Sequence, residues 1–190
     1  MKFTDINVQD IEIGEYYDKK IHLSLNQKPI RFQIPRMYMP FGISGFTPEV
    51  GPTKWNVDFN MNGWDEEGNY VQQFYTFIKA LEQRVVEHVS DTFGKDMSDN
   101  FNSNIKNGPK FRVKIPDSVR VFDVRDDDVT TSLQSGLYAR HSGVAMVELG
   151  GVYFLNKMFG FTWKAYQLKV YEPQRLRGFQ FQVEDDDIMV

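Results

Sequence analysis

Cationic side chains occupy every second position of one short segment, at Lys110, Arg112 and Lys114, with apolar residues between them. This spacing predicts a β-strand with one buried face, which leaves the three cations together on its exposed face. A row of cations attracts phosphate groups, so the segment is a candidate site for a polyanion. Cations in other segments extend the candidate surface: Arg120, Arg140, Lys164 and Lys169.

Aromatic rings are the second type of side chain that a single nucleic-acid strand requires. Bases stack on flat rings, and each stacked base contributes about 1–3 kcal/mol whatever the sequence. Most of the 16 Phe, 9 Tyr and 3 Trp residues are expected in the core, for example Trp55 and Phe59 on the apolar face of a strand. The rings that we expect to face a nucleic acid are Tyr38, Phe41, Trp163 and Tyr166.

Signatures of catalysis are missing from the sequence. It contains no GxxxxGK[ST] or GxGxxG phosphate-binding loop, no GxSxG elbow and no HExxH pair. The absence of cysteine excludes disulfides, thiolate metal sites and cysteine nucleophiles. The adjacent carboxylates Asp126, Asp127 and Asp128 could bind a divalent cation, as in a nuclease, although such runs are more often solvated turns. We therefore expect no enzymatic activity, no cofactor and no metal.

The net charge of -4 conceals an uneven distribution of charges along the chain. Residues 1–100 contain 10 bases and 15 acids, whereas residues 101–183 contain 12 bases and 7 acids. The last seven residues, 184–190, add four acids and no base. A basic half followed by a short acidic end favours a polyanionic partner, with the acidic end competing for the same surface. Chance clustering of the charges is the alternative.

The length of 190 residues fits one domain, and 41% hydrophobic residues are enough to form its core. We place this domain at residues 1–182 and a flexible acidic tail at residues 183–190. No apolar run approaches the roughly 20 residues that a membrane span needs, so no membrane is expected as a partner. The N-terminal segment has no apolar stretch typical of a signal peptide. Together with the lack of cysteine, this predicts an intracellular protein.

The one strong helix signal covers residues 70–89, where apolar residues recur at spacings of three and four and Gly94 follows as a stop signal. Proline and glycine interrupt residues 37–51 so often that we expect a loop there. The rest of the chain is dominated by alternating, strand-like segments that do not alternate with helices. The predicted fold is therefore mostly β with one long helix: an OB-fold-like, partly open β-barrel with an inserted α-helix.

The end of the chain carries the most specific motif, because an acidic string, Glu184 to Asp187, runs into three apolar residues. It resembles the tips of bacterial single-stranded DNA-binding proteins. In that family the tip docks on replication proteins, with a basic rim for the carboxylates and a pocket for the last side chain. The resemblance implies that a polymerase or helicase binds Asp185, Asp186, Asp187, Ile188, Met189 and Val190.

Residues 151–155 and 159–170 resemble the closing hairpin of the OB-fold single-stranded DNA-binding proteins of nucleocytoplasmic large DNA viruses. That family is related to the single-stranded DNA-binding protein of short-tailed phages, which also has an acidic tail. The present chain ends in Val190, whereas the phage and bacterial tips typically end in an aromatic residue. The resemblance implies a protein of the host nucleus or a cytoplasmic virus factory. It would coat and protect single-stranded DNA, independently of sequence, in replication, recombination or repair.

Two other functions stay open. A viral protein-interaction or structural module would use the exposed aromatic residues as a protein interface, and the tail would then be incidental. A metal-dependent nuclease would use Asp126, Asp127 and Asp128. Whether the chain forms a homo-oligomer also stays open.

Overall fold

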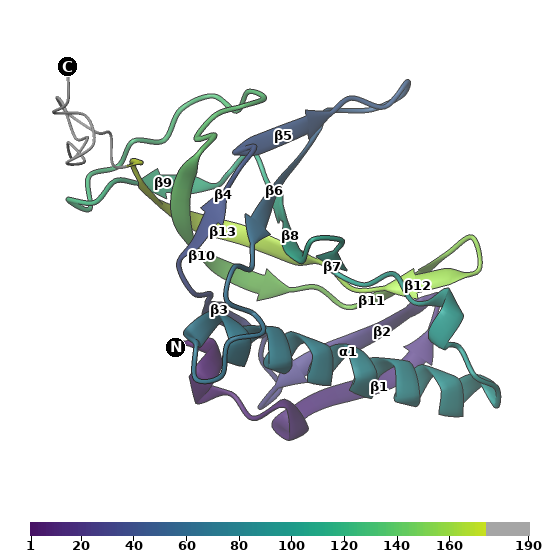
Figure 1. Ribbon diagram of the computed structural model, residues 1–190. Coiled ribbons are helices and arrows are strands. Elements are labelled where there is room, and N and C mark those ends of the chain that lie inside the picture. Colours follow the sequence, from purple (N-terminus) through teal and green to yellow (C-terminus); the bar gives the residue numbers. More distant parts are fainter. Residues whose placement is uncertain (174–190) are drawn as a thin grey trace, which may run out of the picture.

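Five strands close into a barrel in the computed structural model, which describes residues 1–173 (Figure 1). The order around the barrel is β4-β6-β8-β13-β10, and β10 pairs again with β4. β8 and β13 run parallel, and the other neighbours are antiparallel. In chain order this is 1-2-3-5-4, a Greek-key arrangement of the OB-fold type. The barrel strands are β4 (Met37–Met39), β6 (Lys54–Asn60), β8 (Lys110–Ile115), β10 (His141–Leu149) and β13 (Trp163–Tyr171).

The predicted OB-fold-like barrel with an inserted helix is confirmed, and the long pairing of β10 with β13 closes it. The expectation of a loop over residues 37–51 is wrong in part. Met37 and Met39 in β4 are buried on either side of Tyr38, so this short segment is a barrel strand. β5 (Ile43–Phe46) pairs with β6 as a hairpin. Pro40 and Gly42 lie in the short turn between these two strands. Gly42 has a φ of +60° there, a conformation that glycine adopts readily.

The helix α1 (Tyr70–Phe93) connects β6 to β8 and lies across one end of the barrel (Figure 1). It begins where the Asn69 side chain accepts a hydrogen bond from the backbone N–H of Val71, at 2.8 Å. It ends at Gly94, whose φ of 64° is the left-handed conformation that glycine adopts readily. The face that it buries consists of Phe74, Phe77, Ile78, Leu81, Glu82, Val85 and Val89.

A smaller sheet of order β1-β2-β11-β12 lies beside the helix. It consists of β1 (Ile11–Tyr17), β2 (Lys20–Leu25), β11 (Val152–Leu155) and β12 (Met158–Gly160). The short strands β3 (Arg31–Gln33), β7 (Ile105–Lys106) and β9 (Arg120–Phe122) add to β10, β8 and β13 respectively. Single 3₁₀ turns complete the described secondary structure at Phe3–Asp5, Val8–Asp10 and Ser98–Asn100.

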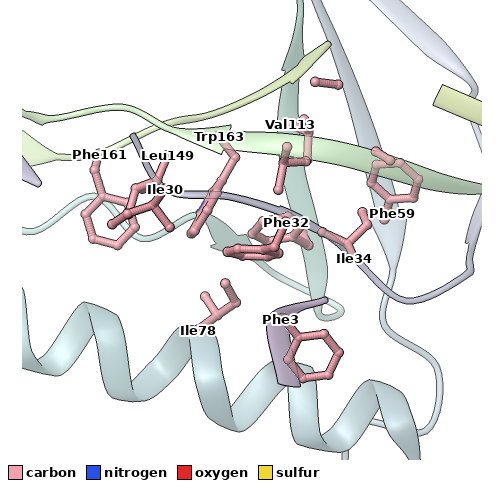
Figure 2. Packing of buried hydrophobic residues seen from close by; sticks show 14 of the residues in the cluster. Phe3, Ile30, Phe32, Ile34, Phe59, Ile78, Val113, Leu149, Phe161 and Trp163 are labelled. Atoms are coloured by element: carbon pink, nitrogen blue, oxygen red, sulfur yellow. The ribbon is translucent and has the colours of Figure 1, made fainter. Parts of the chain in front are cut away.

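The core fills the space between the barrel and α1, and Trp163 stands at its centre. Figure 2 shows the indole of Trp163 directed from β13 toward the helix, with Phe32 and Ile78 nearby. Its ring lies 5.2 Å from the ring of Phe32 and 5.8 Å from that of Phe111, in tilted or edge-on geometry. The inward residues of β8 therefore join the barrel to the helix, and the same alternation turns its cations outward.

Within residues 1–173, no helix is both long enough and apolar enough to cross a membrane. The predicted tail at residues 183–190, and the domain boundary proposed before it, lie outside the described residues.

Candidate nucleic-acid interface

The outer faces of β6 and β8 form the floor of a groove. The two strands pair in register, so that Asn56 lies opposite Lys114 and Asp58 opposite Arg112. The β5–β6 hairpin and the β11–β12 hairpin both project on this side of the barrel, with β7 and β8 between them (Figure 1). Two adjoining cavities that share Asn56, Arg112 and Lys114 make up the groove.

The larger cavity, here called the lysine cavity, has a volume of about 560 Å³. Its cations come from three adjacent strands: Lys54 from β6, Lys114 from β8 and Lys164 from β13. The rings of Trp55, which is half-buried, and of Phe46, which is 63% exposed, also line it. The cavity thus combines cations with accessible aromatic surface.

Lys114 is the electrostatic centre of the lysine cavity. Its partial burial lowers its pKa below the usual value for lysine, and repulsion from Lys54 and Lys164 lowers it further. Both causes disfavour the charged form of the Lys114 amine. A bound phosphate would relieve the repulsion, so the three lysines form a site where an anion is stabilised.

Arg112 differs from its neighbours on β8 because it is already paired. Its Nε and one terminal nitrogen donate to the two carboxylate oxygens of Asp58, at 2.7 and 2.8 Å. The row of cations on this face therefore includes an acid from the adjacent strand. Pairing of β6 with β8 could not be read from the sequence, and the row is less cationic than the sequence indicated.

The second cavity, here called the asparagine cavity, has a volume of about 180 Å³. The segment 102–106 forms one of its walls and is tied to the helix by the buried carboxylate of Glu82. Glu82 accepts hydrogen bonds from the hydroxyl of Ser103 and from the backbone N–H of Asn104, each at 2.9 Å. Tyr153 in β11 closes the cavity, and its hydroxyl accepts a hydrogen bond from the side chain of Asn102.

Two of the predicted rings are accessible next to the remaining cation of β8. Tyr38 is 38% exposed and Phe41 is 58% exposed. The amine of Lys110 lies 5.1 Å from the centre of the Phe41 ring, which is the geometry of a cation–π contact. In the register of the sheet, Tyr38 on β4 lies opposite Asn60 on β6, and Asn60 lies opposite Lys110 on β8. These three residues therefore lie together on the barrel surface.

Tyr166 faces outward because β13 contains an extra residue there. Met146 pairs with Gln167 and Val147 with Ala165, which leaves Tyr166 without a partner on β10. The guanidinium of Arg31 lies 5.5 Å from the centre of its ring.

The expectation that Trp163 stacks on nucleic acid is wrong. Its side chain is completely buried, and a base cannot reach the face of a ring in the core. The strand alternates Trp163 and Ala165 inward with Lys164 outward, and Lys164 does line the lysine cavity. Trp55, in contrast, is only half-buried, although we expected it in the core.

The other predicted cations lie away from the groove. Arg120 donates two hydrogen bonds to Asp128, the shorter at 2.6 Å, and the amine of Lys169 lies 2.6 Å from Asp126. Arg140 is exposed just before β10 and forms no ion pair within residues 1–173. The carboxylates proposed for a metal are thus engaged with cations. Among the described residues, no group of three or more histidine or carboxylate side chains is placed to hold a metal ion.

Sequence reasoning missed Lys54, Lys106 and Asn56. Lys54 and Asn56 alternate with apolar residues, which predicts a strand with both on its outer face, but nothing in the sequence shows that this strand lies next to β8. Lys106 belongs to a segment without a regular pattern. The predicted partner-binding residues Asp185, Asp186, Asp187, Ile188, Met189 and Val190 lie outside the described residues.

Comparisons with known proteins relate the chain to a family and to solved folds. The sequence profile described as "Family of unknown function (DUF5871)" matches residues 69–182. No curated protein sequence matches the chain.

Among solved structures, the fold is similar to gp2.5, a single-stranded DNA-binding protein encoded by bacteriophage T7. The TM-score is 0.52 at 11% identity, over 84% of this chain and 92% of that chain. A single-stranded DNA-binding protein from bacteriophage Enc34, in complex with ssDNA, has a TM-score of 0.46 at 7% identity, over 90% of this chain and 99% of that chain. The T7 likeness supports the OB-fold-like architecture described above.

Proposed function

The chain belongs to the Family of unknown function (DUF5871), and we propose that it binds single-stranded DNA without catalysing a reaction. The observation that carries this proposal is the groove over β6 and β8, with Lys54, Lys114 and Lys164 in one cavity. These strands are the second and third of the barrel. In OB-folds, the face of strands 2 and 3 binds oligonucleotides and oligosaccharides, together with the loops between strands 1 and 2 and between strands 4 and 5.

The loops of this chain lie where such a groove requires them. The connection from strand 1 to strand 2 contains β5, whose Phe46 lines the lysine cavity. The connection from strand 4 to strand 5 contains β11 and β12, and Tyr153 of β11 lines the asparagine cavity. A strand lying across β6 and β8 would therefore meet a loop at each end.

Charge favours a nucleic-acid strand over an oligosaccharide. The lysine cavity has three lysines against one carboxylate, Asp117, while its fourth cation, Arg112, is balanced by Asp58. Phosphates gain from the three lysines, and bases stack on aromatic surface such as that of Phe46 and Trp55. The solved T7 protein of similar fold is a single-stranded DNA-binding protein, which supports the same choice.

The test is a titration of a fluorescently labelled single-stranded oligonucleotide with the full chain at several salt concentrations. We expect the logarithm of the affinity to fall linearly with the logarithm of the salt concentration, by about 0.7 for each phosphate neutralised. Replacing Lys54 and Lys164 together by alanine should weaken binding to every sequence and flatten this slope.

A matched control replaces Lys169 by alanine, because Lys169 lies on the same strand as Lys164 but is paired with Asp126 outside the groove. Absence of strand binding by the full chain would overturn the proposal and favour a protein-interaction module instead. An effect of the Lys169 change equal to that of the groove changes would move the site elsewhere.

The finer parts of the proposal rest on the sequence resemblance. They are a role in replication, recombination or repair, a viral origin, intracellular action, and docking of replication proteins on the C-terminal tail. Binding of purified polymerase or helicase to the full chain and to a chain ending at residue 183 tests the docking.

A further inference from the structure

The asparagine cavity contains a buried amide that the fold does not use. Asn104 is 7% exposed and lines the cavity, and its Nδ2 has no hydrogen-bond partner among the described residues. A buried amide without a partner lowers the stability of a protein, so the position would favour an apolar residue if packing alone mattered. Asn56, on the opposite wall, also makes no side-chain hydrogen bond within residues 1–173.

The cavity wall offers more donors than acceptors. Lys106 donates to the Oδ1 of Asn102 and to the carbonyl of Ser103, which leaves one of its three N–H groups without an acceptor within residues 1–173. Arg112 retains one terminal nitrogen that does not bond Asp58. Among the described residues that line the cavity there is no carboxylate. A ligand group that accepts hydrogen bonds would therefore be matched, and one that only donates would meet like donors.

The chemistry of the cavity lining favours a base over a phosphate. Side-chain amides present a donor and an acceptor side by side, which is the pattern on the edge of a nucleobase, whereas a phosphate presents acceptors only. Tyr153, which is half-buried, adds accessible aromatic surface to the wall. Lys114, at the junction with the lysine cavity, can hold the phosphate that is attached to such a base.

We propose that the asparagine cavity receives one keto-bearing base of the bound strand, thymine in DNA, through Asn104, Asn56 and Lys106. This inference rests on the proposed function, because the base belongs to the strand in the groove. Thymine presents an oxygen at position 4, where cytosine presents an amino group. The cytosine amino group would face the amine of Lys106, which cannot accept a hydrogen bond. Binding therefore favours thymine and is not fully independent of sequence.

The experiment compares the affinities of the full chain for oligo(dT) and oligo(dC) of equal length, because both are pyrimidine strands. We expect oligo(dT) to bind on the order of tenfold more tightly, the range of one well-matched base contact. Asn104→Leu should bring the two affinities close together. It should leave thermal stability unchanged or raised, because leucine fills a similar space without an unpaired amide. Asn56→Leu, on the opposite wall, should reduce the preference independently.

Asn62→Leu is the matched control. Asn62 is exposed just after β6 and lines neither cavity, so its variant should keep the wild-type preference. Equal affinity of the wild-type chain for the two strands would overturn the inference and leave the proposed function intact. A preference that survives both Asn104→Leu and Asn56→Leu would also overturn it. Failure of the wild-type chain to bind either strand would overturn the proposed function, and the inference with it.

Discussion

Whether a cation already has an ion-pair partner, more than its position along the strand, decides if it can bind a phosphate in this protein. Lys110, Arg112 and Lys114 alternate along one strand, yet their surroundings differ. Arg112 is held by Asp58, whereas Lys114 stands between two further lysines. Lys114 therefore has the most to gain from a bound anion, and Arg112 has to share its charge with a carboxylate.

Replacing Lys114 by alanine should weaken binding to every single-stranded sequence and reduce the salt slope by about 0.7. Arg112→Ala should change the slope less, because it removes a cation whose charge Asp58 already balances. Salt titrations of the two variants measure the difference. Equal slope changes would mean that the strand displaces Asp58 from Arg112.

The lowered pKa of Lys114 predicts a dependence on pH. The folded protein releases this proton more readily than the unfolded chain, so the affinity for DNA should decline as pH rises through the lowered pKa, before ordinary lysines titrate. In the window between that pKa and 10.5, the unfolded chain holds the proton that the folded one has lost, so this residue's contribution to stability improves with pH.

The check is Lys114→Arg, since arginine stays charged throughout this range. Affinity measured from about pH 7 to about pH 10 at constant ionic strength should decline less in the variant than in the wild-type chain. Parallel pH profiles for the two proteins would show that Lys114 does not titrate in the site.

At the scale of elements, the alternation of each barrel strand separates core from groove. β13 shows this most clearly, because Trp163 points to the helix and Lys164 to the lysine cavity. The bulge at Tyr166 then shifts the alternation by one residue and keeps Leu168 and Val170 inside. The helix depends on the same pattern, since the inward rings of β8 and β13 are the surface on which it packs.

Trp163→Ala and Tyr38→Ala should therefore affect different properties of the protein, the first its stability and the second its affinity for DNA. The first empties a core position and should lower the free energy of unfolding by about 3–5 kcal/mol. The second removes an accessible ring and should cost about 1–3 kcal/mol of affinity for single-stranded DNA, with little change in stability. Chemical denaturation and oligonucleotide titration of both variants distinguish the two. A stable Trp163→Ala protein with weakened DNA binding would contradict this assignment.

Across the whole molecule, the acidic end of the chain and the lysine cavity carry charges of opposite sign. The last seven residues carry four acids and no base, and the lysine cavity carries three lysines. A tethered polyanion competes at an effective concentration on the order of millimolar.

Deleting residues 184–190 should therefore raise the affinity for DNA, most at low salt, because salt screens the competition. Recruitment of replication proteins should fall. The paired measurement is oligonucleotide affinity and partner pull-down for the full and shortened chains. A control that replaces Ile188, Met189 and Val190 by serine keeps the four charges, so it should lower recruitment alone. Unchanged or lower DNA affinity after deletion would contradict the competition.

The barrel-and-helix class of the fold could be predicted from local sequence patterns. Period-two alternation along residues 110–115 and 163–165, and the three-and-four spacing along 70–89, are local signals of which face is buried. The same signals predict that Lys114 and Lys164 lie on an exterior surface. They failed for Met37–Met39, because a three-residue strand is too short for alternation to outweigh the proline and glycine around it.

Which exterior residues form a site depends on how the strands assemble into the barrel. Lys54, Lys114 and Lys164 are far apart in the chain and meet because β6, β8 and β13 are neighbours in the barrel. Because β6 and β8 are neighbours, Asp58 also contacts Arg112, and Asn56 and Asn104 line one cavity. Strand order and register arise from packing across the whole barrel, and no local spacing in one sequence encodes them. The buried faces of β8 and of the helix could therefore be predicted from their own residues, whereas the groove depended on which strands became neighbours.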